Sequence, residues 1–376
     1  MDNPAMVHQA AAIVSRLSKA AAKITKPTDT EKPTTSFTPA SPEIATGSCK
    51  IIRGSIQTEG FSTAVEDIIL HSWRETTHKQ YGTYLSKWRL FCNKWSINPF
   101  SPTLRQGLDF LAQLFKLGLS YSAINTARSA LSAIVKTPEL THPHFGQHPT
   151  VTRFMKGVFN LRPSLPRYNV TWDASTVIKY LKGVNEDESL LLLSMKLATL
   201  ILLLSGQRIQ SLHLIDNRNV DISNGQVKIR FGDLLKQTRP GYQQKELTFQ
   251  RYPDKALCVV SLLTQYCEHT KDLRGEETAL FIATQKPHRR VSKDTITRWV
   301  KTMLKNAGIN MKIFKPHSIR AASTSKACNL KVPLKTILNT AGWSKDCVFG
   351  RFYNKPVEND SVFSDAILSP ENLSSS

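Results

Sequence analysis

The chain has 376 residues and a formal net charge of +21 at pH 7, from 50 lysines and arginines against 29 aspartates and glutamates. This length predicts two domains, because domains cluster near about 100 to 200 residues, and the charge favours a polyanionic partner such as nucleic acid. The 6 cysteines include no Cys-x-x-Cys pair, which argues against a zinc site and against a disulfide framework.

Residues 1–60 are predicted to form a disordered N-terminal extension. Residues 24–48 are dense in Thr, Pro and Ser, so they cannot bury enough apolar surface to offset the entropy of ordering. Residues 10–22 have helical composition, but an isolated segment of that length is marginal in water. The start of the chain lacks a basic stretch followed by an unbroken apolar core, so we expect no secretory signal.

Residues 61–165 are predicted to form a small α-helical domain. Apolar residues recur at three- and four-residue spacings between Trp73 and Trp95, which is typical of one buried helix face. Thr103 is a predicted N-cap, and Gly118 is expected to end the helix that follows. Two further helices are expected at 120–135 and 151–161, which makes four helices in this domain.

Residues 166–358 are predicted to form a mixed domain, so the fold class is mainly α with a small antiparallel β-sheet. The apolar run 190–204 is too short to cross a bilayer, which needs about 20 residues, and is therefore a predicted buried helix. β-branched residues predict three short strands at 220–222, 227–231 and 246–249. Further helices are expected at 172–182, 255–268, 292–307, 318–328, 334–341 and 345–352. Residues 359–376 are a tail or a C-terminal arm.

Positive charge is spread over both predicted domains. Residues 61–165 hold 12 basic and 5 acidic residues, and residues 166–376 hold 31 and 19. This distribution favours a two-domain clamp around a DNA duplex over a globular enzyme with one basic tail. A basic protein selected for solubility or for RNA association is the alternative.

Four short motifs in the second half of the chain carry candidate chemistry. They are Leu204-Ser205-Gly206-Gln207-Arg208-Ile209, Lys315-Pro316-His317-Ser318-Ile319-Arg320, Gly342-Trp343, and Phe349-Gly350-Arg351-Phe352-Tyr353-Asn354-Lys355. With Lys236, they set arginine, lysine, histidine, arginine and tyrosine in an order that resembles the tyrosine recombinase (phage integrase) family. Within it, the resemblance is to recombinases of eukaryotic mobile elements of the DIRS and Crypton kinds, over roughly residues 61–358.

The resemblance implies a role for the two arginines and the lysine. Arg208 and Arg320 are expected to grip the scissile phosphate and to stabilise the charge that develops on its oxygens. Lys236, in the turn between two strands, is expected to protonate the leaving 5′-oxygen, with Lys228 and Lys245 as rivals for this role. Taken alone, either arginine is more simply interpreted as a contact to the DNA backbone or as a salt-bridge partner.

The other three candidate residues lie near the end of the predicted second domain. His317 is expected to hydrogen-bond the phosphate or to accept the proton of the nucleophile, although a histidine after proline is often only a helix cap. Trp343 occupies the place of a second family histidine and can donate a hydrogen bond through its indole N–H. Tyr353 is the expected nucleophile and needs nearby positive charge to ionise. A core aromatic is the alternative for Tyr353.

The resemblance also implies a DNA-binding (SAM-like, core-binding) domain at 61–165 and a catalytic domain at 166–358. Double-stranded DNA is the expected partner, bound by a homo-tetramer on synapsed duplexes, and the expected location is the nucleus rather than a membrane. No cofactor and no metal are expected, because no carboxylate pair with metal-binding spacing accompanies the motifs. Candidate DNA-binding residues are Lys79, Lys87, Arg128, Lys156, Arg239 and Arg351.

The sequence departs from the commoner family pattern beside the first arginine. Many relatives carry a hydrophobic residue before it and an acidic residue three positions after it, where this chain has Gln207 and Ser211. Asp216 or Asp233 is a candidate replacement for the acidic group. Two rivals to a recombinase stay open: a domesticated protein that binds DNA without cutting it, and an enzyme that relaxes DNA like a type IB topoisomerase.

Overall fold

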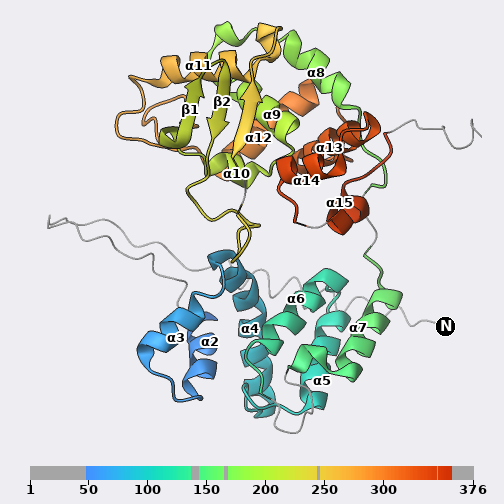
Figure 1. The fold of residues 1–376 in the computed structure, drawn as a ribbon. Helices are drawn as coiled ribbons and strands as arrows, with labels where there is room; N and C mark the ends of the chain where they lie inside the picture. The colour runs from blue at the N-terminus through green and yellow to red at the C-terminus, as the bar shows by residue number, and fades with distance from the viewer. Residues whose placement is uncertain (1–47, 137–143, 165–167, 244–245, 345, 358–376) are drawn as a thin grey trace, which may run out of the picture. The chain divides into compact units, whose positions relative to one another are not determined.

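The computed structural model describes residues 48–136, 144–164, 168–243, 246–344 and 346–357 (Figure 1). The chain divides into two compact units, residues 1–164 and 165–376. The predictions for residues 10–22, for most of 24–48 and for 359–376 lie outside the described residues. No helix within the described ranges is long and apolar enough to cross a membrane.

The first unit is all α-helical. Its helix α4 packs against α2 and α6, and α6 also packs against α5 and α7. Trp88 of α4 is fully buried in the core, and its Nε1 donates to the Pro99 carbonyl at 3.0 Å. Thr103 caps α5 as predicted, in a reciprocal capping box with Gln106. The helices are α2 (Ser48–Gln57), α3 (Thr63–Leu70), α4 (Glu75–Trp95), α5 (Leu104–Lys116), α6 (Tyr121–Ser132) and α7 (Pro149–Leu161).

The first unit begins earlier than residue 61, which corrects the predicted boundary and the predicted helix count. Ile51 and Ile52 of α2 are buried in the core of this unit. Arg53 joins α2 to α3, with Nη2 at 2.7 Å from Asp67 and Nη1 at 3.5 Å from Glu66. A pair of adjacent isoleucines among polar residues carries little helical periodicity. A short helix of this kind is stabilised mainly by its packing against the rest of the unit, which the sequence does not reveal.

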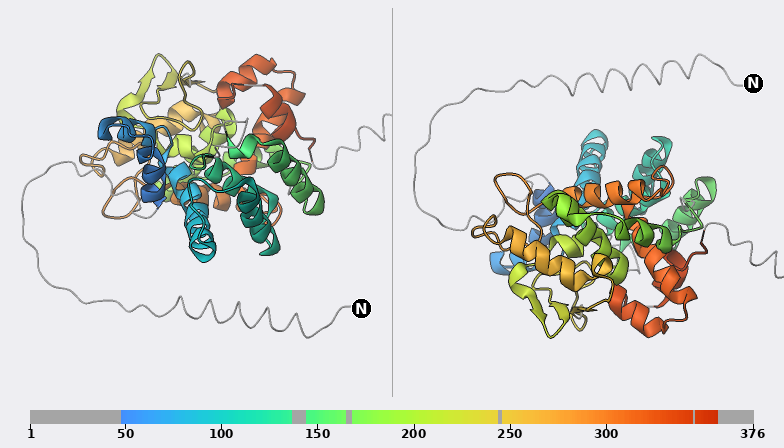
Figure 2. Two further views of the ribbon diagram at one scale, coloured as in Figure 1. Left: turned by 90° about the horizontal axis from the view of Figure 1, so that it is seen from below. Right: turned by 90° about the horizontal axis from the view of Figure 1, so that it is seen from above.

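The second unit is mixed, and the predicted fold class is confirmed: helices surround a three-stranded antiparallel sheet. Helix α9 lies at its centre and packs against α11, α12 and α13. Figures 1 and 2 show α13 to α15 gathered on one side of the unit and strands β1 and β2 on the other. The helices are α8 (Ala174–Lys182), α9 (Leu190–Ser205), α10 (Ile209–His213), α11 (Val259–Thr270), α12 (Lys293–Asn306), α13 (Ile319–Asn329), α14 (Leu334–Ala341) and α15 (Asp346–Phe352).

The sheet has the order β1 (Val220–Ser223), β2 (Gln226–Ile229) and β3 (Leu247–Gln250). Asn224 and Gly225 connect β1 to β2 with φ angles of 50° and 70°, as a tight hairpin turn requires. The register pairs Ile229 with Val220 and with Leu247. The longer connection from β2 to β3 carries Lys236, where the sequence predicted it.

Helix α9 is apolar around most of its circumference, as expected of a buried helix, but it contains one lysine. Lys196 is fully buried. Its Nζ donates to the Glu186 carboxylate at 2.6 Å and to the Val184 carbonyl at 2.9 Å. A buried charge is tolerated only when it is paired and hydrogen-bonded, so this contact anchors the segment before α9.

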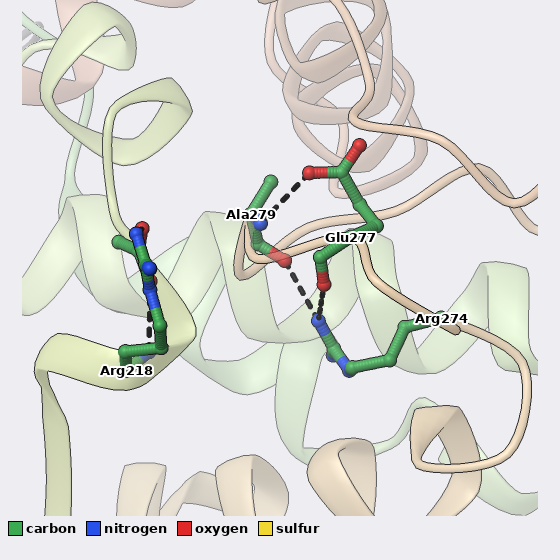
Figure 3. A network of polar contacts seen from close by, with 5 residues as sticks. Arg218, Arg274, Glu277 and Ala279 are labelled. Atoms are coloured by element: carbon green, nitrogen blue, oxygen red, sulfur yellow. Dashed lines mark hydrogen bonds and ion pairs between the residues drawn. The ribbon is translucent and has the colours of Figure 1, made fainter.

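A polar network shapes the segment that leads toward α12 (Figure 3). Arg274 donates to the Ala279 carbonyl at 2.8 Å. The Glu277 carboxylate accepts from the backbone N–H groups of Ala279 at 3.0 Å and Arg290 at 2.9 Å. These backbone bonds, together with the charge of Arg290, lower the pKa of Glu277. Hydrogen bonds from charged side chains to backbone groups therefore stabilise this loop.

The Lys196 contact can be tested by removing the charge while keeping the length of the side chain. In Lys196→Met, Glu186 loses its partner, and we expect the second unit to lose about 2 kcal/mol of unfolding free energy. Its melting temperature should fall by roughly 4 to 8 °C in calorimetry. Lys179→Met, at an exposed position of α8, is the control and should change it by less than about 2 °C. Equal melting curves for the two variants would contradict the anchoring role.

Candidate active site

The turn between α9 and α10 requires a glycine. Gly206 has a φ of +59°, and a Cβ there would lie 3.1 Å from Thr324 Cγ2 and 3.4 Å from Ala341 Cβ. The Gly206 carbonyl accepts a hydrogen bond from Arg320 Nη1 at 2.6 Å. The left-handed conformation and the close packing both favour glycine. This turn therefore joins the motif around Arg208 to the motif around Arg320.

Arg320 lies in the first turn of α13 and is fully buried. Its Cζ lies 4.1 Å from the Trp343 ring centroid and 5.3 Å from the Tyr353 ring centroid. Among the described residues, Nε and Nη2 have no hydrogen-bond partner. Burial and then the charge of Arg208 lower the pKa of Arg320 to about 9, so it stays protonated at neutral pH. The N–H groups on these two nitrogens of a buried cation therefore lack an acceptor within the described residues and are available to a ligand.

Arg208 is held by a neutral group. Its Nη1 donates to Gln237 Oε1 at 2.9 Å, and burial lowers its pKa. No carboxylate within the described ranges forms an ion pair with Arg208 or Arg320. Of the two proposed replacements, Asp216 pairs instead with Arg218 at 2.8 Å, and Asp233, whose charge acts on His213, forms no ion pair with Arg208 among the described residues. Gln237 is the residue that contacts Arg208.

The two unusual residues beside Arg208 bind each other. Ser211 Oγ donates to Gln207 Oε1 at 3.1 Å, and Gln207 Nε2 donates to the Thr340 carbonyl at 2.7 Å. Both side chains are buried. They tie the α9–α10 turn to the end of α14, directly before Gly342 and Trp343. Gln207 and Ser211, which stand where many relatives have a hydrophobic and an acidic residue, therefore satisfy each other's hydrogen bonds inside the protein.

His317 and Tyr353 are in contact. The Nε2 of His317 lies 3.2 Å from the Tyr353 hydroxyl. Burial among protein atoms, followed by the charges of Arg320, Arg208 and Lys236, lowers the pKa of His317 to about 4, although part of its surface stays exposed. The imidazole is therefore neutral at pH 7, and its Nε2 can accept the hydroxyl proton as a hydrogen bond.

The backbone around Tyr353 is fixed on both sides. The buried Ser325 of α13 donates to the Tyr353 carbonyl at 2.7 Å and accepts from the Lys355 N–H at 3.0 Å. Lys355 Nζ donates to the Tyr168 carbonyl at 2.5 Å. The Trp343 ring lies 4.6 Å from the Tyr353 ring, and its indole N–H is buried without a partner among the described residues.

The structure thus brings together Arg208, His317, Arg320, Trp343 and Tyr353, which the sequence places up to 145 positions apart. Lys236 is exposed on the β2–β3 connection, and its charge acts on His317. Sequence reasoning missed Gln237 and Ser325. A polar residue beside the predicted lysine was the only local signal for Gln237, and Ser325 offered none, because its contacts are with backbone atoms.

The candidate DNA-binding residues have different environments. Lys87 and Lys156 are exposed, and so is Lys79, which pairs with Glu75 at 2.6 Å. Arg128 is half-buried and donates to the Gly146 carbonyl at 3.3 Å, so part of its guanidinium is used inside the first unit. Arg239 is exposed, and the side chain of Arg351 lies outside the described residues.

No cluster of three or more His, Cys, Asp or Glu side chains that could hold a metal ion occurs in the part of the chain that the structure describes. The cysteines described are free. The site instead collects cationic and neutral donors around a tyrosine. This arrangement can bind an anion such as a phosphate and can place a hydroxyl nucleophile beside it.

Comparisons with known proteins show which family model and which folds this chain is similar to. Residues 177–359 match the phage integrase family model. The fold is similar to that of the XerH site-specific recombinase bound to palindromic difH substrate, with 13% identity over 85% of this chain and 93% of that chain and a TM-score of 0.55. It is also similar to the Tn1549 transposon integrase in complex with transposon right end DNA, with 16% identity over 86% and 99% and a TM-score of 0.52. No curated protein sequence matches the chain.

The charge state of His317 can be measured directly. We expect its ring signal in NMR to titrate with a midpoint near pH 4, well below the ordinary value of about 6.5. Because the unfolded chain binds this proton at higher pH, the stabilising contribution of neutral His317 is full above about pH 6.5 and declines toward pH 4. Arg208→Gln should raise the midpoint by removing a nearby positive charge. A midpoint between 6 and 7 in the unaltered protein would contradict the described environment.

The Ser325 contacts predict a role in positioning Tyr353. Ser325→Ala leaves the Tyr353 carbonyl and the Lys355 N–H without a buried partner. We expect covalent DNA cleavage in a single turnover to slow by about 10-fold, which corresponds to the loss of one or two hydrogen bonds. DNA affinity, measured by gel shift, should stay within about twofold, because Ser325 faces the protein backbone. An unchanged cleavage rate would show that the segment is held by other contacts.

Proposed function

We propose that this chain, whose residues 177–359 match the phage integrase family model, is a site-specific DNA recombinase that works through a 3′-phosphotyrosyl intermediate. The observation that carries the proposal is the buried guanidinium of Arg320, which has free N–H donors, no carboxylate partner among the described residues, and Tyr353 beside it. A structural arginine would be expected to have its donors satisfied. A phosphodiester oxygen would supply the acceptor and the negative charge that these donors lack.

In this proposal the two arginines bind the non-bridging oxygens of the scissile phosphate. The Tyr353 hydroxyl attacks phosphorus, and its proton passes toward His317, which is neutral and 3.2 Å away. The P–O5′ bond breaks, and Lys236 protonates the leaving oxygen. The buried Trp343 indole N–H supplies a further donor to the phosphate. The contacts of His317, Arg320 and Trp343 with Tyr353 support these roles.

No metal and no nucleotide enters the proposed reaction. The phosphotyrosyl bond replaces one phosphodiester with another and so conserves its energy for rejoining. The positive charge that neutralises the phosphate comes from the side chains themselves. The three cations Arg208, Lys236 and Arg320 all act on His317 and lower its pKa.

Further proposals concern the partners and the biological setting. Double-stranded DNA is the proposed partner, bound by both basic units, with a homo-tetramer acting on two synapsed duplexes in the nucleus. We propose integration or excision of a mobile element of the DIRS or Crypton kind. The basic charge of both units supports the DNA partner, and the likeness to a transposon integrase supports a mobile element.

The proposal is tested by trapping the covalent intermediate. Labelled duplexes with a nick, tiled across the DNA that flanks the coding sequence, are incubated with the protein in EDTA and resolved on a denaturing gel. We expect a protein–DNA adduct with the unaltered chain. Tyr353→Phe should form no adduct and should still bind DNA, because it loses only the nucleophilic oxygen.

The outcomes distinguish a recombinase from a non-cutting DNA-binding protein and from a topoisomerase-like enzyme. DNA binding without an adduct on any duplex would favour a DNA-binding protein that does not cut. An adduct accompanied by relaxation of a supercoiled plasmid that lacks a trapped site would favour a topoisomerase-like enzyme. Adduct formation on one duplex sequence, with strand exchange only when two such sites are present, is the result expected of a recombinase.

A further inference from the structure

Gln237 lies in a four-residue turn next to the proposed leaving-group acid. The Thr238 N–H donates to the Leu235 carbonyl at 3.0 Å, and the Leu235 N–H donates to Thr238 Oγ1 at 3.1 Å. Lys236 and Gln237 therefore occupy the two central positions of a closed turn. Because the turn fixes both residues together, the position of one side chain constrains the other.

The side chain of Gln237 connects this turn to the arginine site. Its Oε1 accepts from Arg208 Nη1 at 2.9 Å across 29 positions of sequence. Leu235 is buried, whereas Lys236 and the following residues Arg239 to Gly241 are exposed. The turn is thus anchored at one end by Leu235 and at its centre by the bond to Arg208.

We propose that Gln237 is a positioning residue that couples the phosphate-binding Arg208 to the placement of Lys236 at the leaving oxygen. This inference rests on the proposed function. A carboxylate at this position would cancel part of the charge of Arg208. The neutral amide oxygen orients the guanidinium by a hydrogen bond and leaves its charge for the phosphate. Gln237 thereby replaces the acidic residue that Ser211 does not supply.

The coupling can be isolated by changing the leaving group. In the ordinary reaction, the P–O5′ bond breaks with its electron pair on oxygen, which takes a proton from Lys236. When sulfur replaces the bridging 5′-oxygen, the leaving group is a thiolate with a thiol pKa near about 8.5, and it departs without protonation. A defect in Lys236 placement is therefore relieved by sulfur, whereas a defect in phosphate binding is not.

The experiment measures single-turnover adduct formation by the full chain on matched oxygen and sulfur substrates of the trapped duplex. On oxygen, Gln237→Ala should slow cleavage by roughly 10- to 100-fold. On sulfur, it should react within about threefold of the unaltered protein, as should Lys236→Ala. In the Lys236→Ala background, adding Gln237→Ala should slow the oxygen reaction by less than about threefold, because the two changes remove one function.

Gln243→Ala is the matched control, because Gln243 is an exposed glutamine of the same connection, and it should react at the unaltered rate on both substrates. Equal slowing of Gln237→Ala on oxygen and sulfur would overturn the coupling and assign Gln237 to Arg208 alone. An unaltered rate for Gln237→Ala on oxygen would also overturn it. If the unaltered protein forms no adduct on either substrate, the proposed function itself fails.

Discussion

The second unit is organised around positive charge that the protein does not neutralise. Arg320 is fully buried, and Arg208 lies close enough to lower its pKa. Their partners are the carbonyl of Gly206 and the amide of Gln237, both uncharged. Burying like charges without a counterion opposes folding, so the surrounding packing must offset this cost. A bound phosphate would remove the repulsion, and the arrangement is therefore complementary to an anionic ligand.

The packing around these charges also positions Tyr353. Gly206 allows α9, α13 and α14 to approach closely, because a side chain there would collide with Thr324 and Ala341. Trp343 follows α14 and stacks on Arg320, while Tyr353 packs against Trp343. The hydroxyl of Ser325 then fixes the Tyr353 backbone. The close approach of these helices thus determines where Trp343 and Tyr353 lie, and with them the Tyr353 hydroxyl.

The sequence located much of the fold and most of the candidate site. Helical periodicity identified α4 to α7, and β-branched runs identified the three strands, because these signals are local. Helix α2 escaped prediction, since only its packing in the core of the first unit distinguishes it. The proposed compensation by Asp216 was wrong for a local reason: Arg218, two positions later in the sequence, binds this carboxylate.

By itself, the sequence determined the residue types that phosphoryl transfer to a tyrosine needs, together with their motifs and the basic character of both units. These properties follow from composition and from short-range order. Only the tertiary structure decided that Arg208 is oriented by Gln237, that Ser325 holds the Tyr353 segment, and that His317 is neutral beside the hydroxyl. Each of these depends on a contact between groups 28 or more positions apart in the sequence, and such contacts exist only once the helices have packed.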